Sequence, residues 1–431
     1  MKKSIIQPGR LLALALFALT AAPASAYDWP KLYDPLQLLT FNLDIDPGDW
    51  SKVKSDTSFT IEVPAMLWAD GDLDEPDPVL VSVRRKSADV LGDKVSLKID
   101  INEYVDQKWN GIKKLSLENG DDVDVVAEGY AWYLNHVAAE SSTSGYNPGL
   151  AAWIKLYVNG EYAGVYVNVE QPDKTFLKNR GLYTTNETWL YKAGDVGTDY
   201  ELKVGDPDSP ATAALCYAPF GAEGSDGGGN GKGNGKGNGK DKGGNDSGGS
   251  SGCTVPDGDN AMAAELNDLI DMEAMLTLGA VSAFHMGPDD LFSKGKNFYF
   301  IDFGGDKRLY TQWDLDTVFT SDNPDGSIYG SAKKGRKRSG STELSQTAYQ
   351  EVILNNAVFR QQYDRIMAGL LSGPLQVDAQ IAFLYELERL LTPALEADPN
   401  RNMPHGVPWR FDALRQWVSG RVININEQLG N

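Results

Sequence analysis

The chain has 431 residues and a formal net charge of −20 at pH 7. This acidity argues against a nucleic-acid-binding protein, because such proteins need an excess of Lys and Arg against phosphates. The length is sufficient for two domains or lobes with a sizeable core.

Residues 1–26 have the pattern of a secretory signal. Three positive charges precede the apolar run 11–19, and an Ala-Ser-Ala motif at 24–26 suits cleavage. The run is too short to cross a bilayer as a helix, and no later apolar run is long enough to do so. We therefore expect a secreted or extracytoplasmic protein, in a periplasm or at a cell surface, that begins near Tyr27 and has no membrane span.

Residues 27–205 are expected to form a β-rich N-terminal lobe. Alternating apolar residues predict strands at 41–46, 59–67, 79–85 and 95–102. Asp124 suits the N-cap of a helix that ends near residue 139. Farther on, Asn159-Gly160 predicts a hairpin between two more strands.

An acidic turn in this half resembles the start of a calcium-binding loop. Asp70, Asp72 and Asp74 have the right spacing, but Glu75 stands in place of the required glycine and Val81 in place of the closing glutamate. A solvated hairpin turn is the favoured interpretation. A Ca²⁺-stabilised extracellular module is the alternative.

Residues 206–253 form a low-complexity insertion rich in Gly, Asn and Lys, which cannot bury a core. The two cysteines of the chain, Cys216 and Cys253, bracket most of it. In an exported protein such a pair is expected to form a disulfide. Closing this loop would stabilise the fold by about 4 kcal/mol in the chain-entropy model.

Residues 254–431 are expected to form a helix-rich C-terminal lobe. Periodic apolar residues predict helices near 261–285, 343–371, 377–391 and 410–429, with an apolar hairpin at 297–319. A β-rich half followed by a helical half is the α+β layout of a two-lobed, atypical protein-kinase-like fold.

The hairpin ends in the sequence Trp-Asp-Leu-Asp. Alternation places Asp314 and Asp316 on the same side, where two carboxylates repel each other unless a cation lies between them. Asp290 and Asn297 add two more oxygen ligands, and the set suits Mg²⁺ with a phosphate, as phosphoryl transfer requires. A solvated strand end is the alternative interpretation.

The histidines give no support to other hydrolytic sites. His136, His285 and His405 have no partner at metal-ligand spacing, and no Ser-His-Asp order is visible. Zinc protease and serine hydrolase interpretations are therefore weak.

Four sequence blocks in order resemble the spore coat protein H (CotH) kinase-like family, and together they span most of the chain. They are VRRKSADVLGDKVSLKIDINEYVDQKWNGIKKLSLENGDDVD, IKLYVNGEYAGVYVNVEQPDKTFLKNRG, NFYFIDFGGDKRLYTQWDLDTVF, and FRQQYDRI with ADPNR. The resemblance implies an exported, atypical kinase that uses ATP with Mg²⁺ or Mn²⁺ on Ser or Thr of secreted or surface proteins. Other members of the family are coat components or surface adhesins.

The resemblance also assigns a nucleotide site. Lys98, with Lys94 in reserve, matches the lysine that faces the nucleotide phosphates. Glu128 matches the glutamate that orients this lysine, and Glu170 falls where a strand enters the hinge over the adenine. For Lys98 a solvent-facing strand lysine is the alternative, and for Glu128 an exposed helix glutamate.

The same comparison assigns the catalytic and metal-binding residues. Asp290 matches the catalytic aspartate, with its neighbour Asp289 as the alternative. Asn297 and Asp314 match the metal-binding pair, and Asp316 is their companion.

Two departures from the family pattern favour a second hypothesis. Ser87 stands where members have a glycine, and Gly287-Pro288-Asp289-Asp290 replaces an Asn-Trp-Asp run. A non-catalytic surface or coat-binding protein, an adhesin or pseudokinase, therefore stays open. A basic loop at 333–338 is expected either to dock an acidic substrate or to be a solvated loop.

Overall fold

The computed structural model describes residues 29–121, 124–193, 200–207, 258–304, 307–319, 323–329, 349–400 and 411–430. The predicted signal at 1–26, the two cysteines with the insertion between them, and the basic loop at 333–338 lie outside the described residues.

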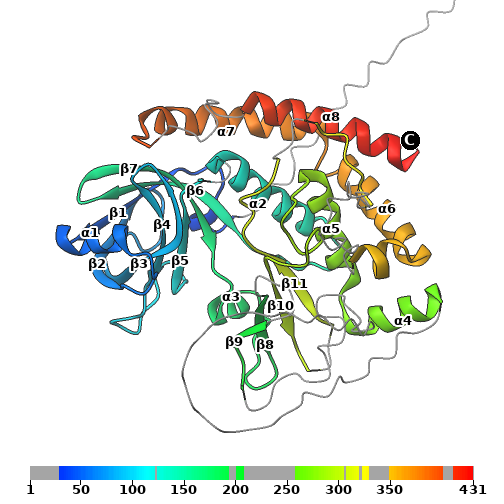
Figure 1. The fold of residues 1–431 in the computed structure, drawn as a ribbon, viewed down its shortest axis with the longest axis horizontal. Coiled ribbons are helices and arrows are strands. Elements are labelled where there is room, and N and C mark those ends of the chain that lie inside the picture. The colour runs from blue at the N-terminus through cyan, green and yellow to red at the C-terminus, as the bar shows by residue number, and fades with distance from the viewer. Residues whose placement is uncertain are drawn as a thin grey trace, which may run out of the picture.

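Seven strands close into a barrel in the order β1-β2-β3-β4-β5-β7-β6 (Figure 1). Antiparallel neighbours form most of it, and parallel pairing of β1 with β6 closes it. Closure leaves no exposed strand edge in this sheet. The strands are β1 (Leu39–Ile45), β2 (Val63–Asp70), β3 (Val79–Leu91), β4 (Lys94–Asp100), β5 (Lys114–Glu118), β6 (Ala151–Val158) and β7 (Glu161–Glu170).

Alternation along these strands separates an apolar interior from a polar outer face. On β3 and β4, Val83 and Leu97 are fully buried in the barrel core, whereas Arg84 and Lys98 are only partly buried. The predicted strand at 59–67 begins only at Val63, because a short helix, α1 (Pro47–Ser55), and a loop precede it.

The acidic turn after Asp70 joins the antiparallel strands β2 and β3, in agreement with the hairpin turn favoured from the sequence. Asp72 and Asp74 each pair with Lys31, at 2.9 Å. The Asn159-Gly160 turn has positive φ values of 52° and 79° and joins β6 to β7 as predicted.

A second sheet of four strands has the order β11-β10-β8-β9. It combines two segments that are far apart in the sequence, so the predicted boundary at residue 205 does not follow the sheets. The strands are β8 (Trp189–Ala193), β9 (Tyr200–Val204), β10 (Phe298–Asp302) and β11 (Leu309–Gln312).

Helices pack around this sheet and against the barrel. The predicted N-cap is confirmed, since Asp124 accepts a hydrogen bond from Ala127 N at the start of the first long helix. The predicted helix at 261–285 is two helices, because Ile270 is extended and Asp271 caps a new start. The helices are α2 (Val125–Glu140), α3 (Lys174–Asn179), α4 (Asp259–Leu269), α5 (Met272–His285), α6 (Ala357–Ser372), α7 (Val377–Ala397) and α8 (Phe411–Leu429), with a π-helix at Tyr349–Leu354.

The molecule has two apolar cores. One fills the barrel, and the other lies among α2, the second sheet and the C-terminal helices. Figure 1 shows α7 reaching from the helical part over the barrel. The mixed α+β class is confirmed, with a closed seven-stranded barrel as its β-rich part. Within the described ranges, no helix combines the length and the apolarity that a membrane crossing needs.

Candidate active site

The hairpin of β10 and β11 brings Asn297 and Asp314 to the same end. Trp313 N donates to Asn297 O at 2.8 Å, one residue beyond the last pair of the ladder. Asn297 and Asp314 both have positive φ, 55° and 60°. Outside glycine this conformation is uncommon, and it is enriched at functional sites.

A hydrogen bond orients the Asn297 side chain. Its amide nitrogen donates to Asp289 O at 2.9 Å. The amide oxygen is therefore the atom that Asn297 can offer to a cation beside Asp314.

Carboxylates from two other elements, β5 and α2, gather near Asp314 around one lysine. Lys86 of β3 pairs with Glu118 at the end of β5. Burial lowers the pKa of Lys86, but the charges of Glu118, Asp314 and Glu128 outweigh it and raise the pKa. Lys86 is therefore a cation held among acids. We call Lys86, Glu118, Glu128, Asp314 and Asp316 the acidic cluster.

Glu128 is the most buried carboxylate of the acidic cluster. Its residue is only 2% exposed. Burial raises its pKa, and the charges of Glu118 and Asp316 add to the effect. The positive charge of Lys86 acts on this carboxylate against several negative ones, so a bound cation would stabilise the arrangement further.

Aromatic rings line the same place. The ammonium of Lys86 lies 5.0 Å from the ring centre of Trp313, and Trp313 meets Tyr299 edge-on at 5.4 Å. Lys192 of β8 lies 6.0 Å from the ring of Tyr299. Burial lowers the pKa of Lys192, as do Lys203 and Lys86, while Asp314 opposes this shift.

Lys98 lies among basic groups rather than in the acidic cluster. Burial lowers its pKa to about 8, and the charges of Arg84, Lys114, Lys203 and Lys192 add to this effect. The sequence comparison assigned Lys98 to the nucleotide phosphates, but the structure places Lys86 beside Asp314 and Glu128.

Lys94, the reserve candidate, holds the barrel to the end of α7. It is buried, donates to Val165 O, lies 3.4 Å from the Asp398 carboxylate and covers the ring of Tyr166 at 4.5 Å. These contacts engage the Lys94 ammonium within the fold.

Glu170 is paired within the fold. Its two carboxylate oxygens accept from the two terminal nitrogens of Arg180, at 2.9 and 2.5 Å. Both residues are largely buried. The side chain predicted to lie at the adenine hinge is thus engaged with Arg180.

Asp290 holds its own loop. One carboxylate oxygen accepts from Phe292 N at 3.0 Å and Ser293 N at 2.8 Å, and the other accepts from the Ser282 hydroxyl of α5. Burial raises the pKa of Asp290, and these donors oppose the shift. The neighbouring Asp289 instead pairs with lysines, at 2.6 and 2.7 Å.

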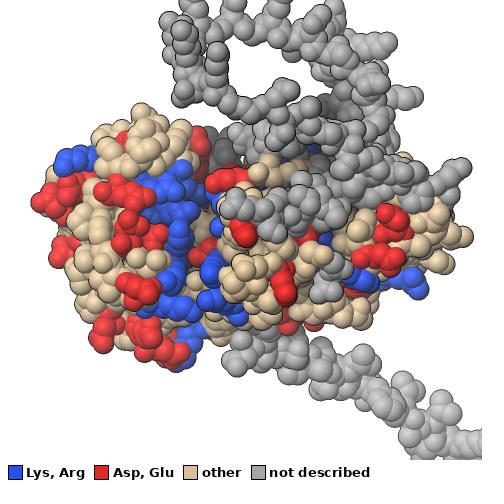
Figure 2. All heavy atoms as spheres, turned by 90° about the horizontal axis from the view of Figure 1, so that it is seen from below, with Lys and Arg blue, Asp and Glu red and all other residues tan. Residues whose placement is uncertain are grey.

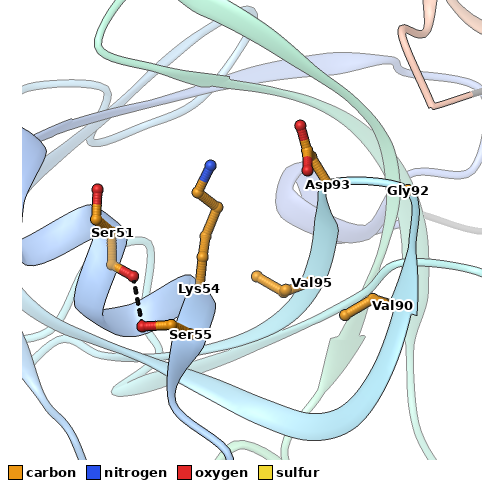
Figure 3. Close-up of a pocket in the computed structure, with 7 residues that line it drawn as sticks. All are labelled: Ser51, Lys54, Ser55, Val90, Gly92, Asp93 and Val95. Atoms are coloured by element: carbon orange, nitrogen blue, oxygen red, sulfur yellow. Dashed lines mark hydrogen bonds between the residues drawn. The ribbon is translucent and has the colours of Figure 1, made fainter.

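Ser87 lies on β3 of the β3–β4 hairpin, between Arg85 and Val90, where the pairing with β4 shifts in register. Its carbonyl accepts from Arg85 Nε at 2.6 Å. A cavity of about 310 Å³ lies between this hairpin and α1 (Figure 3), lined by Ser51, Lys54, Ser55, Val90, Gly92, Asp93 and Val95. It contains no member of the acidic cluster.

The donor set fits a magnesium ion bound together with phosphates. Among the residues that the structure describes, no three His, Cys, Asp or Glu side chains are placed to enclose a metal. Mg²⁺ does not need such a cage, because it binds through one or two carboxylates, waters and substrate phosphates. Asp314 and Asn297 offer oxygens of this kind, and Lys86 offers a positive charge to a phosphate.

Two members of the acidic cluster escaped the sequence analysis. Lys86 alternates with buried residues in the same way as Arg84 and Lys98, so alternation gives no reason to choose it. Glu118 ends a five-residue strand whose last residues look like a turn in the sequence. The available signal was that Glu118 is the last polar residue of its strand; Lys86, in the middle of β3 beside a shift in pairing register, carries no such mark.

Comparison with known proteins agrees with this picture. A family model described as "CotH kinase protein" matches residues 83–421, a range that includes the whole acidic cluster. No curated protein matches the chain significantly. The resemblance noted in the sequence is confirmed, and the chain belongs to the CotH kinase family.

Proposed function

We propose that the protein is an exported kinase that transfers the γ-phosphate of ATP to Ser or Thr of secreted or surface proteins. The observation that carries this proposal is the gathering of Lys86, Glu118, Glu128 and Asp314 from the barrel, α2 and the hairpin. A buried lysine among carboxylates, next to an Asn–Asp pair, is the set of charges that phosphoryl transfer uses.

In this proposal the barrel serves as the N-terminal lobe of an atypical kinase-like fold and the helical part as the C-terminal lobe. Asp314 and the Asn297 amide oxygen would hold Mg²⁺ or Mn²⁺, and Lys86 would bind a nucleotide phosphate. Glu118, paired with Lys86, fixes the lysine in place. When bound, ATP would supply the phosphoryl group, and the metal would neutralise charge in the transition state.

The catalytic role predicted for Asp290 is also part of the proposal. Asp290 is the candidate for accepting the hydroxyl proton, in a loop fixed by Ser282 and Ser293. Its largely buried carboxylate would have to become accessible when substrate binds, as catalytic contacts often tighten only in the complex.

The direct test is phosphate transfer by the purified protein. Labelled ATP with Mg²⁺ or Mn²⁺ should label the chain itself or a Ser-containing acceptor, and ATP should raise the melting temperature. Asp314→Asn should reduce transfer roughly 100-fold or more, since it removes a charge that acts in the transition state. Asp44→Asn, at an exposed carboxylate on the outside of β1, is the matched control.

The result that overturns the proposal is the absence of labelling together with the absence of any nucleotide-dependent shift in melting. It would favour a non-catalytic surface or coat-binding protein. The observation that favours this alternative is that the Asp290 carboxylate already accepts from Phe292 and Ser293 of its own loop and from Ser282 of α5. Binding to a surface partner that survives Asp314→Asn would support it.

A further inference from the structure

Basic side chains gather beside the acidic cluster. Arg84, Lys98 and Lys114 lie on the adjacent strands β3, β4 and β5, and Lys192 and Lys203 lie on β8 and β9. The pKa of Lys98, lowered by burial, is lowered further by the other four, so all five charges are close together. We call these five residues the basic stripe.

The space-filling view shows where basic residues collect on this face. Figure 2 shows a band of Lys and Arg down the barrel side, bordering a hollow, with more basic atoms across the hollow. The whole chain has a net charge of −20, so such a concentration of positive charge is a local feature.

The strand register forces part of the stripe together. Arg84 lies directly opposite Lys98, and Lys114 lies on the next strand, two positions from Ser116, the partner of Lys98 in the ladder. Like charges placed opposite each other destabilise a sheet. Neighbouring strands are about 4.8 Å apart, so the three cations cover about 10 Å of the barrel wall.

The charges of the stripe are only partly balanced within the protein. Arg84 lies 3.4 Å from Glu62, Lys114 lies 3.1 Å from Asp100, and Lys203 pairs with Glu201. Within the part of the chain that the structure describes, Lys98 and Lys192 have no ion pair. Two half-buried cations are therefore outside ion-pair distance of a described carboxylate, and each lies near other cations.

The shape of the stripe suits an extended ligand better than a nucleotide. Lys86 is the lysine inside the acidic cluster, and Lys192 is the member of the stripe whose pKa is affected by the charge of Asp314. The other members lie on β3, β4 and β5 of the barrel and on β9. A row of cations leading to a phosphoryl-transfer centre matches a chain that carries several negative charges.

We propose that the basic stripe binds an acidic segment of the protein substrate, with Asp, Glu or phosphorylated residues beside the Ser or Thr that is modified. This inference rests on the proposed kinase function and names the substrate class. The hydroxyl would be delivered past Lys192 toward Asp314, while Lys98 and Arg84 hold the flanking acidic residues.

Peptide binding measured without ATP tests the inference separately from turnover. A fluorescent peptide with a Ser flanked by Glu residues should bind the full chain, and its Lys-flanked counterpart should not. The double variant Lys98→Gln with Lys192→Gln should weaken acidic-peptide binding roughly tenfold or more, and added salt should weaken binding to the wild type. The control double variant changes Lys108 and Lys155, on other surfaces of the barrel part, to Gln.

Each outcome is decisive for one of the two proposals. Equal losses in stripe and control variants, or equal binding of the Lys-flanked peptide, would overturn the substrate inference. So would a stripe variant that loses the ATP-dependent rise in melting temperature but keeps peptide binding, since the stripe would then hold nucleotide. If the kinase proposal fails instead, the acidic peptide still binds but no phosphate transfer is observed.

Discussion

Lys86 is the residue on which the proposed chemistry depends most directly. It is held by Glu118, lies against the ring of Trp313, and has a raised pKa caused by the surrounding carboxylates. It therefore stays charged throughout the physiological pH range. A fixed ammonium of this kind is what a nucleotide phosphate requires.

Lys86→Met should lower kcat/KM for ATP roughly 100-fold or more, since the phosphate loses its fixed cation. Lys98→Met should leave kcat/KM for ATP within a few-fold of the wild type, because Lys98 lies outside the acidic cluster. Steady-state kinetics at varied ATP concentration measures both. The reverse order of the two losses would return the nucleotide role to Lys98.

The fold of the Lys86→Met protein needs its own check. Removing the lysine leaves Glu118 and Glu128 without their cation, which destabilises a buried site. A second variant, Lys86→Met with Glu118→Gln, removes both partners of the pair. Near-native melting of this double variant, with activity still absent, would separate chemistry from stability.

At the scale of elements, the end of α7 is tied to the barrel by one buried ion pair. Asp398, just after the helix, lies 3.4 Å from Lys94 of β4 and accepts from Val165 N at 2.9 Å. It also accepts from Asn400 N at 2.8 Å. This network joins the two apolar cores through polar contacts at one place.

Asp398→Ala should lower the free energy of unfolding by about 3–5 kcal/mol, because Lys94 then stays buried without its counter-charge. Urea denaturation of the purified protein measures the loss. Lys52→Met, at an exposed helix ion pair on α1, should change it by less than about 0.5 kcal/mol. Similar losses in both variants would show that the buried pair has no special role.

Local sequence signals predicted several elements well. Asp124 marks the start of α2 because its carboxylate satisfies a free N–H of the first turn. Asn159-Gly160 marks the β6–β7 turn because both residues tolerate positive φ. The break at Ile270 was missed, since the apolar pattern continues across it while the backbone does not.

At the scale of the whole molecule, the closed barrel could not be predicted from local pattern. Its closure depends on the parallel pairing of Leu39–Ile45 with Ala151–Val158, segments more than a hundred positions apart. Alternation shows which side of a strand is apolar, but not which strand lies beside it.

The candidate site shows the same limit. Asn297, Asp314 and Asp316 were found because they share one hairpin and one oxygen-rich motif. Lys86 and Glu118 come together only through the order of the barrel strands, which places the middle of β3 and the end of β5 near α2 and the hairpin. Any one of several lysines on the same polar face would have fitted the sequence pattern equally well.

Acid should destabilise the whole fold through two buried histidines. Burial lowers the pKa of His136 to about 4, and burial with the charge of Arg421 lowers that of His285 to about 3. Histidine in the unfolded chain takes up a proton near pH 6.5, so below that pH the unfolded chain binds more protons than the folded chain. Stability is thus full above about pH 6.5 and is lost as pH falls toward the folded pKa values.

Each histidine should lower the free energy of unfolding by about 2 kcal/mol between pH 7 and pH 5. The raised pKa values of Glu128 and Asp290 act in the opposite sense above about pH 4, because there the folded chain binds more protons at these carboxyls, so the contribution of His136 is taken from the difference between a variant and the wild type. His136→Phe keeps a ring against Trp29, which lies 4.2 Å away, but cannot take up a proton. Between pH 7 and pH 5, urea denaturation should therefore show a loss of stability about 2 kcal/mol smaller in this variant than in the wild type, and an equal loss would show that His136 is already accessible to protons in the folded protein.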